Sequence, residues 1–486
     1  MLYIGIDLGT SAVKLLLVDE KGNILNTVTK EYPLIFPKDG WSEQNPADWW
    51  EGTMSALSEI TEDIDKSLIK GIGVAGQMHG LVILDENDEV IRPAILWNDG
   101  RTEKEVEYLN NIIGKEKLSQ YTANIAFAGF TGPKILWVKE NEPENFKKIR
   151  KIMLPKDYIN YKLTGVHACD YSDASGMLLL DVKNRCWSKE MLGICSVTED
   201  MMPRLFESSE VIGEVKEEFG FPCAKVVAGA GDNAAAAIGT GTVGNGKCNI
   251  SLGTSGTVFI SSESFGVDSF NALHSFCHAD GNFHLMGCML SAASCNKWFS
   301  EEILKENDFL ELQKDITEEM LGNNSIYFLP YLMGERSPIN DTDARGVFLG
   351  LSLDTKREDM LLAVLEGVSF AIRDSFEVAK SLGLNIEESC LCGGGAKSPL
   401  WRKILSNILG IKLNILKTEQ GPGFGGAVLS MVGTGEYSTV KEACEALTEI
   451  SEVITPDERL ASLYEERYNK YKQIYPALKG VFKNIR

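Results

Sequence analysis

A strand–turn–strand segment that occurs twice, about half a chain apart, constrains the fold of this chain more than any other feature. The first copy is residues 3–18, with the turn Leu8-Gly9-Thr10-Ser11, and the second is residues 249–260, with the turn Leu252-Gly253-Thr254-Ser255. Short apolar runs on both sides of a turn of small residues predict strands. Because the same turn recurs in the same setting, we predict two domains of related design.

The chain of 486 residues is long enough for two large α/β domains. After the first copy, a helix is expected from Asn45-Pro46 and a strand at 71–75, which is the alternating pattern of an α/β fold. The glycine-rich segment 239–246 is small, polar and unpatterned, as a domain boundary often is. We therefore predict an N-terminal domain over residues 1–244 and a C-terminal domain over residues 245–486.

Composition excludes several classes of partner. Acidic residues number 69 and basic residues 48, a formal net charge of −21, so the chain lacks the cations that hold a nucleic acid backbone. It has no apolar run of about 18 residues and no basic region at its start, so we expect neither a membrane span nor a signal peptide. The 11 cysteines have no repeated spacing, which indicates reduced thiols. We expect a cytoplasmic protein that binds no nucleic acid and no membrane.

The paired turns predict a phosphate site. Glycine lets a backbone approach an anion closely, while N–H groups and hydroxyls supply hydrogen-bond donors. Gly9, Thr10 and Ser11 of the first turn, with Gly253 and Thr254 of the second, would then hold a triphosphate from two sides. Two ordinary hairpin turns are the alternative interpretation.

Two charged residues flank the first turn. Asp7 stands at the end of a strand, where its carboxylate would repel phosphate unless a divalent cation lay between them. Mg²⁺ suits such a place, because it prefers one or two carboxylates together with water and phosphate oxygens. Asp7 could instead cap its own loop. Lys14 could contact the terminal phosphate or could be a surface lysine, and the pattern favours neither.

Asp232 is the candidate general base. It follows a buried strand at 226–231 and precedes Asn233 and four alanines, so we expect it at a helix N-terminus. A helix N-terminus stabilises a carboxylate in its charged form, which is the form a base needs. An aspartate that only caps the helix would show the same pattern.

Two further segments have the pattern of ligand sites. Residues 390–401 predict a strand, a turn of three glycines and a helix that starts at Ser398-Pro399, and such a turn admits a flat ring or a ribose. His79 follows the buried strand at 71–75, where open α/β sheets bind ligands. A purely structural histidine is the alternative.

Other patterns point to functions that we do not expect. The GxGxxG pattern occurs three times, but never between a strand and a helix with an acidic residue about twenty positions on; the matches are 71–76, 239–244 and 421–426. A dehydrogenase is therefore not favoured. Five potential zinc ligands gather in predicted hairpin strands without a Cys-x-x-Cys pair, so we favour a structural role; they are His274, Cys277, His278, His284 and Cys288.

Two longer segments, residues 129–138 and 346–366, resemble the signature patterns of the FGGY family of carbohydrate kinases. Shorter segments resemble the xylulose-phosphorylating members of that family, and these are 41–44, 76–80, 94–99, 154–158, 274–278 and 334–336. The resemblance runs essentially end to end. It implies two related actin-like, ribonuclease H-like α/β domains that flank a central cleft, as in the sugar kinase/Hsp70/actin architecture.

The resemblance also implies roles for individual residues. Asp232 matches the catalytic base of the family beside the sugar, and Asp7 matches the aspartate associated with Mg²⁺ and with activity. The residues that match the sugar side are Met78 and His79, with Trp97 and Asn233 as pocket neighbours. Those that match the nucleotide side are Thr10, Thr254, Gly394, Gly395 and Ala396. One segment, 291–294, departs from the family pattern because it has Ser-Ala-Ala-Ser where many relatives have glycine.

The activity that the resemblance implies is transfer of the γ-phosphoryl group of ATP to the 5-hydroxyl group of D-xylulose, with Mg²⁺ as cofactor. A kinase for another ketopentose or for a pentitol, such as a ribulose kinase, is the alternative. We expect the domains to close around bound sugar with a hinge at 239–246, and the protein to be a homodimer. A nucleotide-switched binding protein of the same fold would need a peptide-binding module, and nothing after Gly433 has that pattern.

Overall fold

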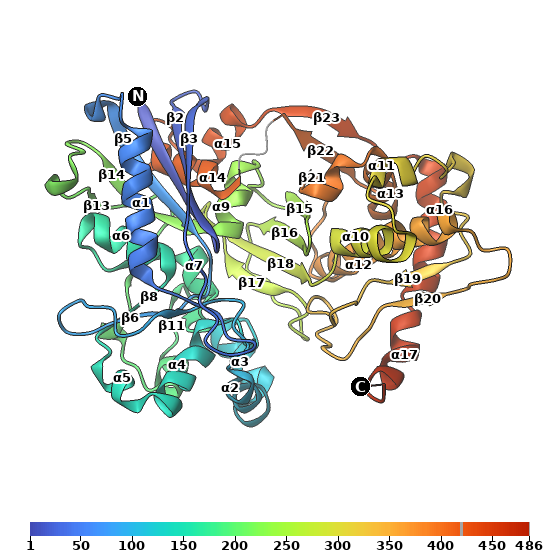
Figure 1. The fold of residues 1–486 in the computed structure, drawn as a ribbon, viewed down its shortest axis with the longest axis horizontal. Coiled ribbons are helices and arrows are strands. Elements are labelled where there is room, and N and C mark those ends of the chain that lie inside the picture. The colour runs from blue at the N-terminus through green and yellow to red at the C-terminus, as the bar shows by residue number, and fades with distance from the viewer. Residues whose placement is uncertain (418–420, 486) are drawn as a thin grey trace.

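Two β-sheets, one in each half of the molecule, organise the chain (Figure 1). The computed structural model describes residues 1–417 and 421–485. Within these residues, the strands of the first sheet are, in spatial order, β13 (Val211–Glu214), β14 (Lys225–Gly231), β5 (Ile69–Gly76), β1 (Leu2–Leu8), β2 (Ala12–Asp19) and β3 (Ile24–Glu31). The strands of the second are β17 (His274–Cys277), β18 (Phe283–Met289), β16 (Gly256–Ser262), β15 (Cys248–Leu252), β21 (Glu388–Cys392), β22 (Lys412–Leu416) and β23 (Ile450–Ile454).

The two sheets share one order of antiparallel and parallel strand pairs, although β17 adds a strand beside β18 and although β13 precedes β14 in the chain whereas β23 follows β22. In the first, β1, β2 and β3 form an antiparallel meander, β5 and β14 pair in parallel on the other side of β1, and β13 closes the edge in antiparallel orientation. In the second, β15, β16 and β18 form the meander, β21 and β22 pair in parallel, and β23 closes the edge. The predicted fold of two related α/β units is therefore confirmed, and the repeated turn joins the first two strands of each meander.

Local sequence signals account for the first helix. In α1 (Pro46–Ile60) the Asn45 side chain caps the N-terminus and Pro46 occupies the first helical position, as predicted. The inner face of this helix carries Trp49, Leu57 and Ile60, whose side chains are fully buried. Burial of each such side chain stabilises the fold by roughly 1.5–3 kcal/mol.

The remaining helices cover the sheets and fill their connections. In the first half they are α2 (Glu103–Glu107), α3 (Lys115–Thr122), α4 (Thr131–Asn141), α5 (Pro143–Lys148), α6 (Pro155–Thr164), α7 (Tyr171–Ser175), α8 (Lys189–Cys195) and α9 (Asp232–Gly239). In the second half of the sequence they are α10 (Ala293–Trp298), α11 (Phe309–Leu312), α12 (Arg357–Ser381), α13 (Pro399–Leu409), α14 (Gly421–Gly433), α15 (Val440–Leu447), α16 (Glu458–Tyr471) and α17 (Ile474–Phe482). None of them, over the described residues, combines the length and the apolar run needed to cross a bilayer.

Short strands complete the connections. They are β4 (Glu43–Gln44), β6 (Val82–Leu84), β7 (Ala94–Ile95), β8 (Lys151–Met153), β9 (Ala168–Asp170), β10 (Leu180–Asp181), β11 (Cys186–Trp187), β12 (Arg204–Phe206), β19 (Tyr327–Leu329) and β20 (Val347–Leu349).

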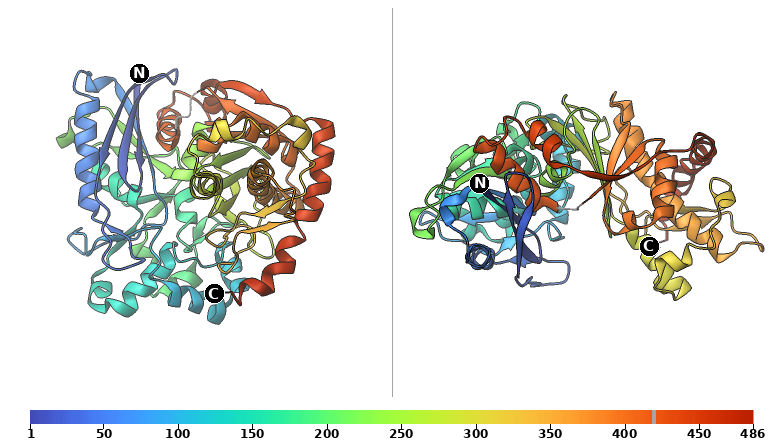
Figure 2. Two further views of the ribbon diagram at one scale, coloured as in Figure 1. Left: turned by 45° about the vertical axis from the view of Figure 1, so that its right-hand side comes forward. Right: turned by 90° about the horizontal axis from the view of Figure 1, so that it is seen from above.

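Helix α14 comes late in the chain but packs on the first sheet, beside β1 and β5 (Figures 1 and 2). The approach is so close that a Cβ atom on Gly5 would lie 1.8 Å from the Gly423 carbonyl oxygen, and one on Gly73 would lie 1.9 Å from that of Gly426. The glycines of the third GxGxxG match therefore serve helix–sheet packing. Helix α14 belongs to the predicted C-terminal domain by its place in the sequence, but it packs on the first sheet. The domain boundary after residue 244 therefore stays a prediction.

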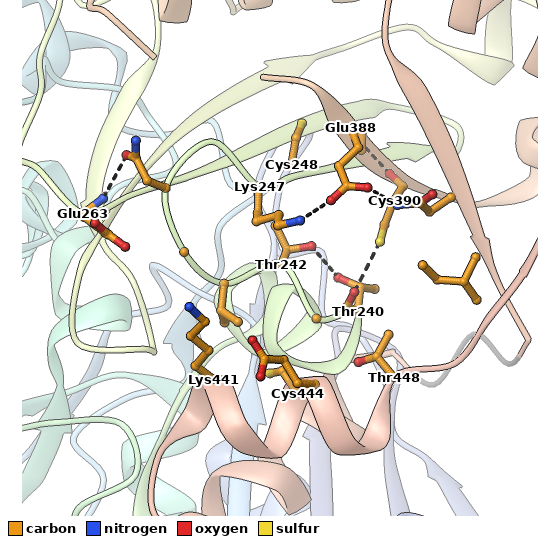
Figure 3. Close-up of a pocket in the computed structure, with 18 residues that line it drawn as sticks. Thr240, Thr242, Lys247, Cys248, Glu263, Glu388, Cys390, Lys441, Cys444 and Thr448 are labelled. Carbon is orange, nitrogen blue, oxygen red and sulfur yellow. Dashed lines mark hydrogen bonds and ion pairs between the residues drawn. The ribbon is translucent and has the colours of Figure 1, made fainter. Parts of the chain in front are cut away.

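The predicted hinge connects α9 to β15 and lines a pocket of about 460 Å³ (Figure 3). The starts of β15 and β21 and helix α15 form its other walls, so this pocket lies at the opposite end of these strands from the second Leu-Gly-Thr-Ser turn. The Thr240 and Thr242 hydroxyls are 2.9 Å apart, and the Cys390 thiol donates to the Thr240 carbonyl at 3.3 Å. These contacts join the hinge to the second sheet.

Candidate active site

The carboxyl ends of three neighbouring parallel strands bring the first group of predicted site residues together. Leu8 at the end of β1 pairs with Gly76 of β5, and Gly76 pairs with Gly231 at the end of β14. The segments that follow or end these strands carry Asp7, Met78, His79 and Asp232. This is the edge at which open α/β sheets bind ligands.

Asp232 is the first residue of α9 and is half-buried. Its Oδ1 atom accepts hydrogen bonds from the Asn233 backbone N–H at 2.7 Å and from the Asn233 side chain at 2.9 Å. Burial, helped by the nearby charge of Asp7, raises the pKa of Asp232 to about 7. The helix position is as predicted, but the expectation that the charged form would be stabilised is wrong, because burial and a like charge outweigh the helix N-terminus.

Asp7 lies opposite Lys14 in the β1–β2 pair and is half-buried. Burial raises its pKa to about 6, against the lowering effect of the Lys14 ammonium. Asp7 pairs with Ala75 of β5, and Ala75 pairs with Ala230 of β14, so Asp7 and Asp232 lie at the same end of neighbouring strands. Two such carboxyl groups leave an excess of negative charge at this edge of the sheet.

The first turn is held from several sides. The Thr10 hydroxyl donates to Gln77 Oε1 at 3.1 Å and accepts from the Trp97 indole N–H at 2.9 Å. The Gly9 N–H donates to the Ala12 carbonyl at 3.0 Å within the hairpin. The Gly9 N–H is therefore already bonded, and Gly9 contributes only space for an anion. The Ser11 side chain is exposed.

Met78 and His79 lie between the strand ends and the neighbouring helices. The Asn233 amide lies 3.8 Å from the Met78 sulfur, which links Met78 to the residue next to Asp232. His79 has a positive φ of 68° and stacks on Phe130, with ring centroids 4.7 Å apart. Its Nδ1 lies 2.7 Å from the Gly176 carbonyl, and burial lowers its pKa to about 3. The imidazole is therefore neutral with its proton on Nδ1, so Nε2 is left as an acceptor.

The nucleotide-side residues come together on the second sheet in the same manner. Ser251 of β15 pairs with Cys392 of β21, so Gly253 and Thr254 follow one strand where Gly394 and Gly395 follow its neighbour. A Cβ atom on Gly395 would lie 2.6 Å from the Leu252 side chain, which shows how closely the two turns approach.

The segment that departs from the family pattern lies against the second turn. The Ala292 N–H donates to the Thr254 carbonyl at 3.0 Å, and the Ala293 N–H donates to the Gly253 carbonyl at 2.8 Å. Within the described residues, the buried Ser291 and Ser294 hydroxyls have no hydrogen-bond partner. They are the groups beside this turn that a ligand could satisfy.

The second half of the molecule also reaches the first group of residues. Phe276 and Met286 of the β17–β18 hairpin pack in one core cluster with Met78 and Phe130. The electrostatic effects of both Asp232 and Arg336 act on Cys288 of β18. The sequence interpretation gave Arg336 no role, and only its place in a family-like segment pointed to it.

The histidine-rich segment is an aromatic stack. His274 and Phe276 are parallel with centroids 5.4 Å apart, and His284 stacks on Phe259 at 4.0 Å. Burial lowers the pKa of His274 and of His284 well below the usual range. Over residues 1–417 and 421–485, no group of three or more His, Cys, Asp or Glu side chains is arranged to hold a metal ion.

Comparisons with known proteins agree with this arrangement. Residues 2–239 match the N-terminal domain, and residues 248–434 the C-terminal domain, of the FGGY family of carbohydrate kinases. The xylulose kinase of Escherichia coli (strain K12) is 39% identical over 483 residues, which are 98% of this chain and 99% of that protein. The xylulose kinase of Bacillus subtilis (strain 168) is 37% identical over 486 residues, 98% of this chain and 97% of that one. The crystal structure of a xyloylose kinase from Brucella ovis has a TM-score of 0.93 and 39% identity, and covers 99% of this chain and 100% of its own.

Proposed function

Because this chain belongs to the FGGY family of carbohydrate kinases, we propose that it transfers the γ-phosphoryl group of ATP to the 5-hydroxyl group of D-xylulose. The product would be D-xylulose 5-phosphate. The observation that carries the proposal is the position of Asp232, at a strand end beside Met78 and Asn233. Xylulose kinases at 37–39% identity over nearly the full length of both chains support D-xylulose as the sugar.

In the proposed reaction Asp232 is the general base. It accepts the proton of the sugar hydroxyl while the sugar oxygen bonds to the γ-phosphorus and ADP departs. Phosphoryl transfer passes through a loose transition state in most analyses, so the oxygen gains charge late. Positioning and electrostatics therefore contribute more than base strength. A base whose pKa is about 7 is half deprotonated near neutral pH.

Asp7 fits a role in holding Mg²⁺. The carboxyl groups of Asp7 and Asp232 are both half-buried, and burial raises the pKa of each. A cation beside them would stabilise their charged forms. An oxygen ligand of this kind, with water and phosphate oxygens, is what Mg²⁺ prefers. The ion would neutralise charge on the phosphate oxygens. Lys14, across the pair from Asp7, supplies a second positive charge on the same side.

Met78, His79, Trp97 and Asn233 are the proposed sugar contacts. His79 Nε2 can accept a hydrogen bond from a sugar hydroxyl because the ring is neutral. Trp97 is 44% exposed, although its indole N–H is fixed to Thr10, so its ring is free to cover a sugar. Rigid positions of this kind fix the orientation of a small polar ligand.

The nucleotide is proposed to lie on the second sheet. Gly253 and Thr254 would hold its phosphates together with Thr10 and Ser11 of the first turn, and Gly394, Gly395 and Ala396 would admit the adenosine. The open space beside Gly394, where an added Cβ atom would meet nothing within 4 Å, and the unpartnered Ser291 and Ser294 hydroxyls support this placement.

A kinase for another ketopentose or for a pentitol is the second candidate. The experiment that decides between them measures ADP release with D-xylulose, D- and L-ribulose, glycerol, gluconate and pentitols. We expect the highest kcat/KM for D-xylulose. A higher kcat/KM for a ribulose or a pentitol would replace D-xylulose in the proposal, and no sugar-dependent ADP release at all would contradict the kinase activity.

The assembly and location of the protein also stay predictions. We propose a homodimer, which sedimentation equilibrium would test by giving twice the chain mass of 53.5 kDa. We propose a cytoplasmic location, which cell fractionation would test.

A further inference from the structure

Arg336 is a cation near the proposed sugar contacts, because it lies over Phe127, which packs on Phe130, and Phe130 stacks on His79. It lies on the connection between β19 and β20, in the second half of the molecule, and its side chain is half-buried. Its guanidinium carbon lies 5.4 Å from the centre of the Phe127 ring, and the N–H of the next residue, Ser337, donates to the Cys288 carbonyl at 3.0 Å. The charge of Arg336 also lowers the pKa of His79 and of His274, which places it near the proposed sugar contacts.

Among the residues that the structure describes, no carboxylate forms an ion pair with Arg336. The arginines that do take part in ion pairs are Arg92, Arg101, Arg185, Arg357, Arg373, Arg402 and Arg467. The nearest acid in the sequence, Glu335, uses Oε1 to accept from the backbone N–H groups of Leu290 at 2.9 Å and of Arg336 at 2.8 Å. Its Oε2 is buried without a partner, and burial raises the pKa of Glu335 to about 8. Glu335 is therefore mostly neutral at pH 7 and leaves the Arg336 charge available.

The chemistry of the reaction suggests what this charge binds. A guanidinium is a planar fork of N–H donors that matches the oxygens of a phosphate or a carboxylate. The anionic groups that the substrates bring to the proposed reaction are phosphates. The Ser337–Cys288 backbone hydrogen bond and the pairing of Cys288 with Thr257 place Arg336 beside the strand that follows the second Leu-Gly-Thr-Ser turn, where the phosphates are proposed to lie.

We propose that the Arg336 guanidinium binds the phosphoryl group as it arrives on the sugar, and that Arg336 is thereby a catalytic residue. The proposal rests on the kinase activity proposed above. In the step, the sugar oxygen forms the new bond to phosphorus, and the bond from phosphorus to the β,γ-bridging oxygen breaks. The electron pair of that bond stays on ADP, and the hydroxyl proton goes to Asp232. Arg336 gains and loses no atom; it neutralises charge on the phosphoryl oxygens.

The test compares the affinity of the protein for the sugar and for its phosphate. Titration calorimetry with D-xylulose and with D-xylulose 5-phosphate is carried out on the wild type, Arg336→Ala and Arg336→Lys. Loss of a charge-assisted contact predicts that Arg336→Ala weakens binding of the phosphate ester by on the order of tenfold to a hundredfold. Binding of the free sugar should change less than about twofold on the same reasoning. Arg336→Lys, which keeps the charge but not the fork, should fall between the two.

Turnover supplies an independent measurement. We expect kcat of Arg336→Ala to fall by about 10²–10³ and to recover in part when guanidinium chloride is added at concentrations that leave the wild type folded. Arg357→Ala is the control, because Arg357 is an exposed residue whose contacts are with Glu358 and Asp315 on the surface. It should keep wild-type values.

Two results would overturn the role of Arg336. One is an equal loss of affinity for the sugar and its phosphate, which would make Arg336 a sugar-positioning residue. The other is unchanged affinity for the phosphate. The ADP assay on the wild type decides the kinase activity separately, so a protein that phosphorylates sugar but shows either result keeps its function and loses only this assignment.

Discussion

At the scale of single residues, the properties of Asp232 follow from groups far away in the sequence. The residue lies at a helix N-terminus, yet burial and Asp7 raise its pKa to about 7. A protonation equilibrium so close to neutral pH suits a group that must first accept a proton and later release it.

The first prediction concerns the removal of this base. Asp232→Asn keeps the size of the side chain and one acceptor oxygen for the Asn233 N–H groups, so the pocket should still bind the sugar. We expect kcat to fall by about 10²–10⁴. Steady-state kinetics and calorimetry on the same sample check both parts, and near-normal turnover would refute the assignment.

The second prediction concerns pH. As a base, Asp232 must be deprotonated, so kcat/KM should rise with pH and level off above about pH 7. The stability of the protein should change in the opposite direction. A folded pKa above the unfolded one stabilises the fold most below the unfolded pKa, and this contribution is lost as pH rises through about 7.

The Asn variant provides the control for the pH prediction. Because it does not titrate, melting temperatures of wild type and Asp232→Asn should diverge between pH 5 and pH 8, with the variant the more stable at the higher pH. Parallel melting curves over this range would contradict the raised pKa.

At the scale of elements, a buried charged cluster supports the end of β14, directly before Asp232. Lys156 of α6 lies 2.6 Å from Asp157 and 2.9 Å from Asp170, and all three side chains are fully buried. Asp170 accepts from the Ser172 hydroxyl, and this hydroxyl accepts from the Gly231 N–H at 3.2 Å. The cluster therefore connects α6 and α7 to the residue directly before Asp232.

The third prediction separates the members of this cluster. Lys156→Met leaves buried carboxylates without their cation and should lower the free energy of unfolding by about 3–5 kcal/mol. Asp173 also lies in the cluster, but its carboxyl is 3.7 Å from the Lys156 ammonium, has no hydrogen-bond partner among the described residues, and has a pKa that burial raises well above the usual range. Asp173→Asn should therefore cost far less than Lys156→Met. Denaturant unfolding of the two variants checks this, and equal losses would show that Asp173 is ionised.

At the scale of the whole molecule, the proposed reaction needs contributions from both sheets. The base and the sugar contacts come from the half of the molecule that holds the first sheet, while the second Leu-Gly-Thr-Ser turn, the glycine turn at 393–395 and Arg336 come from the other half. Water would compete with the sugar for the phosphoryl group if the two halves stayed open. The glycine-rich connection between α9 and β15 is the expected hinge.

The fourth prediction is closure of the two halves. Small-angle scattering should give a smaller radius of gyration with the sugar and a non-hydrolysable ATP analogue than without ligands. The comparison with nucleotide alone is the control, because the sugar is expected to drive closure. An unchanged radius of gyration with both ligands bound would count against it.

Some of these properties were readable from the amino-acid sequence. The repeated turn predicted two related α/β units, Asn45-Pro46 and Ser398-Pro399 predicted helix starts, and Asp232 was expected between a strand and a helix. Each of these features depends on residues within a few positions of one another, because turn conformation and helix capping are set by local backbone geometry.

The tertiary structure alone decided the rest. It placed α14 on the first sheet, raised the pKa of Asp232 through burial and Asp7, and brought Arg336 beside β18 and over the Phe127 ring. No pattern of neighbouring residues predicts these features, because burial and charge interactions act between segments that only the folded chain brings close together. The sequence determined which elements form and which residues end them, and the packing of distant segments determined what those residues can do.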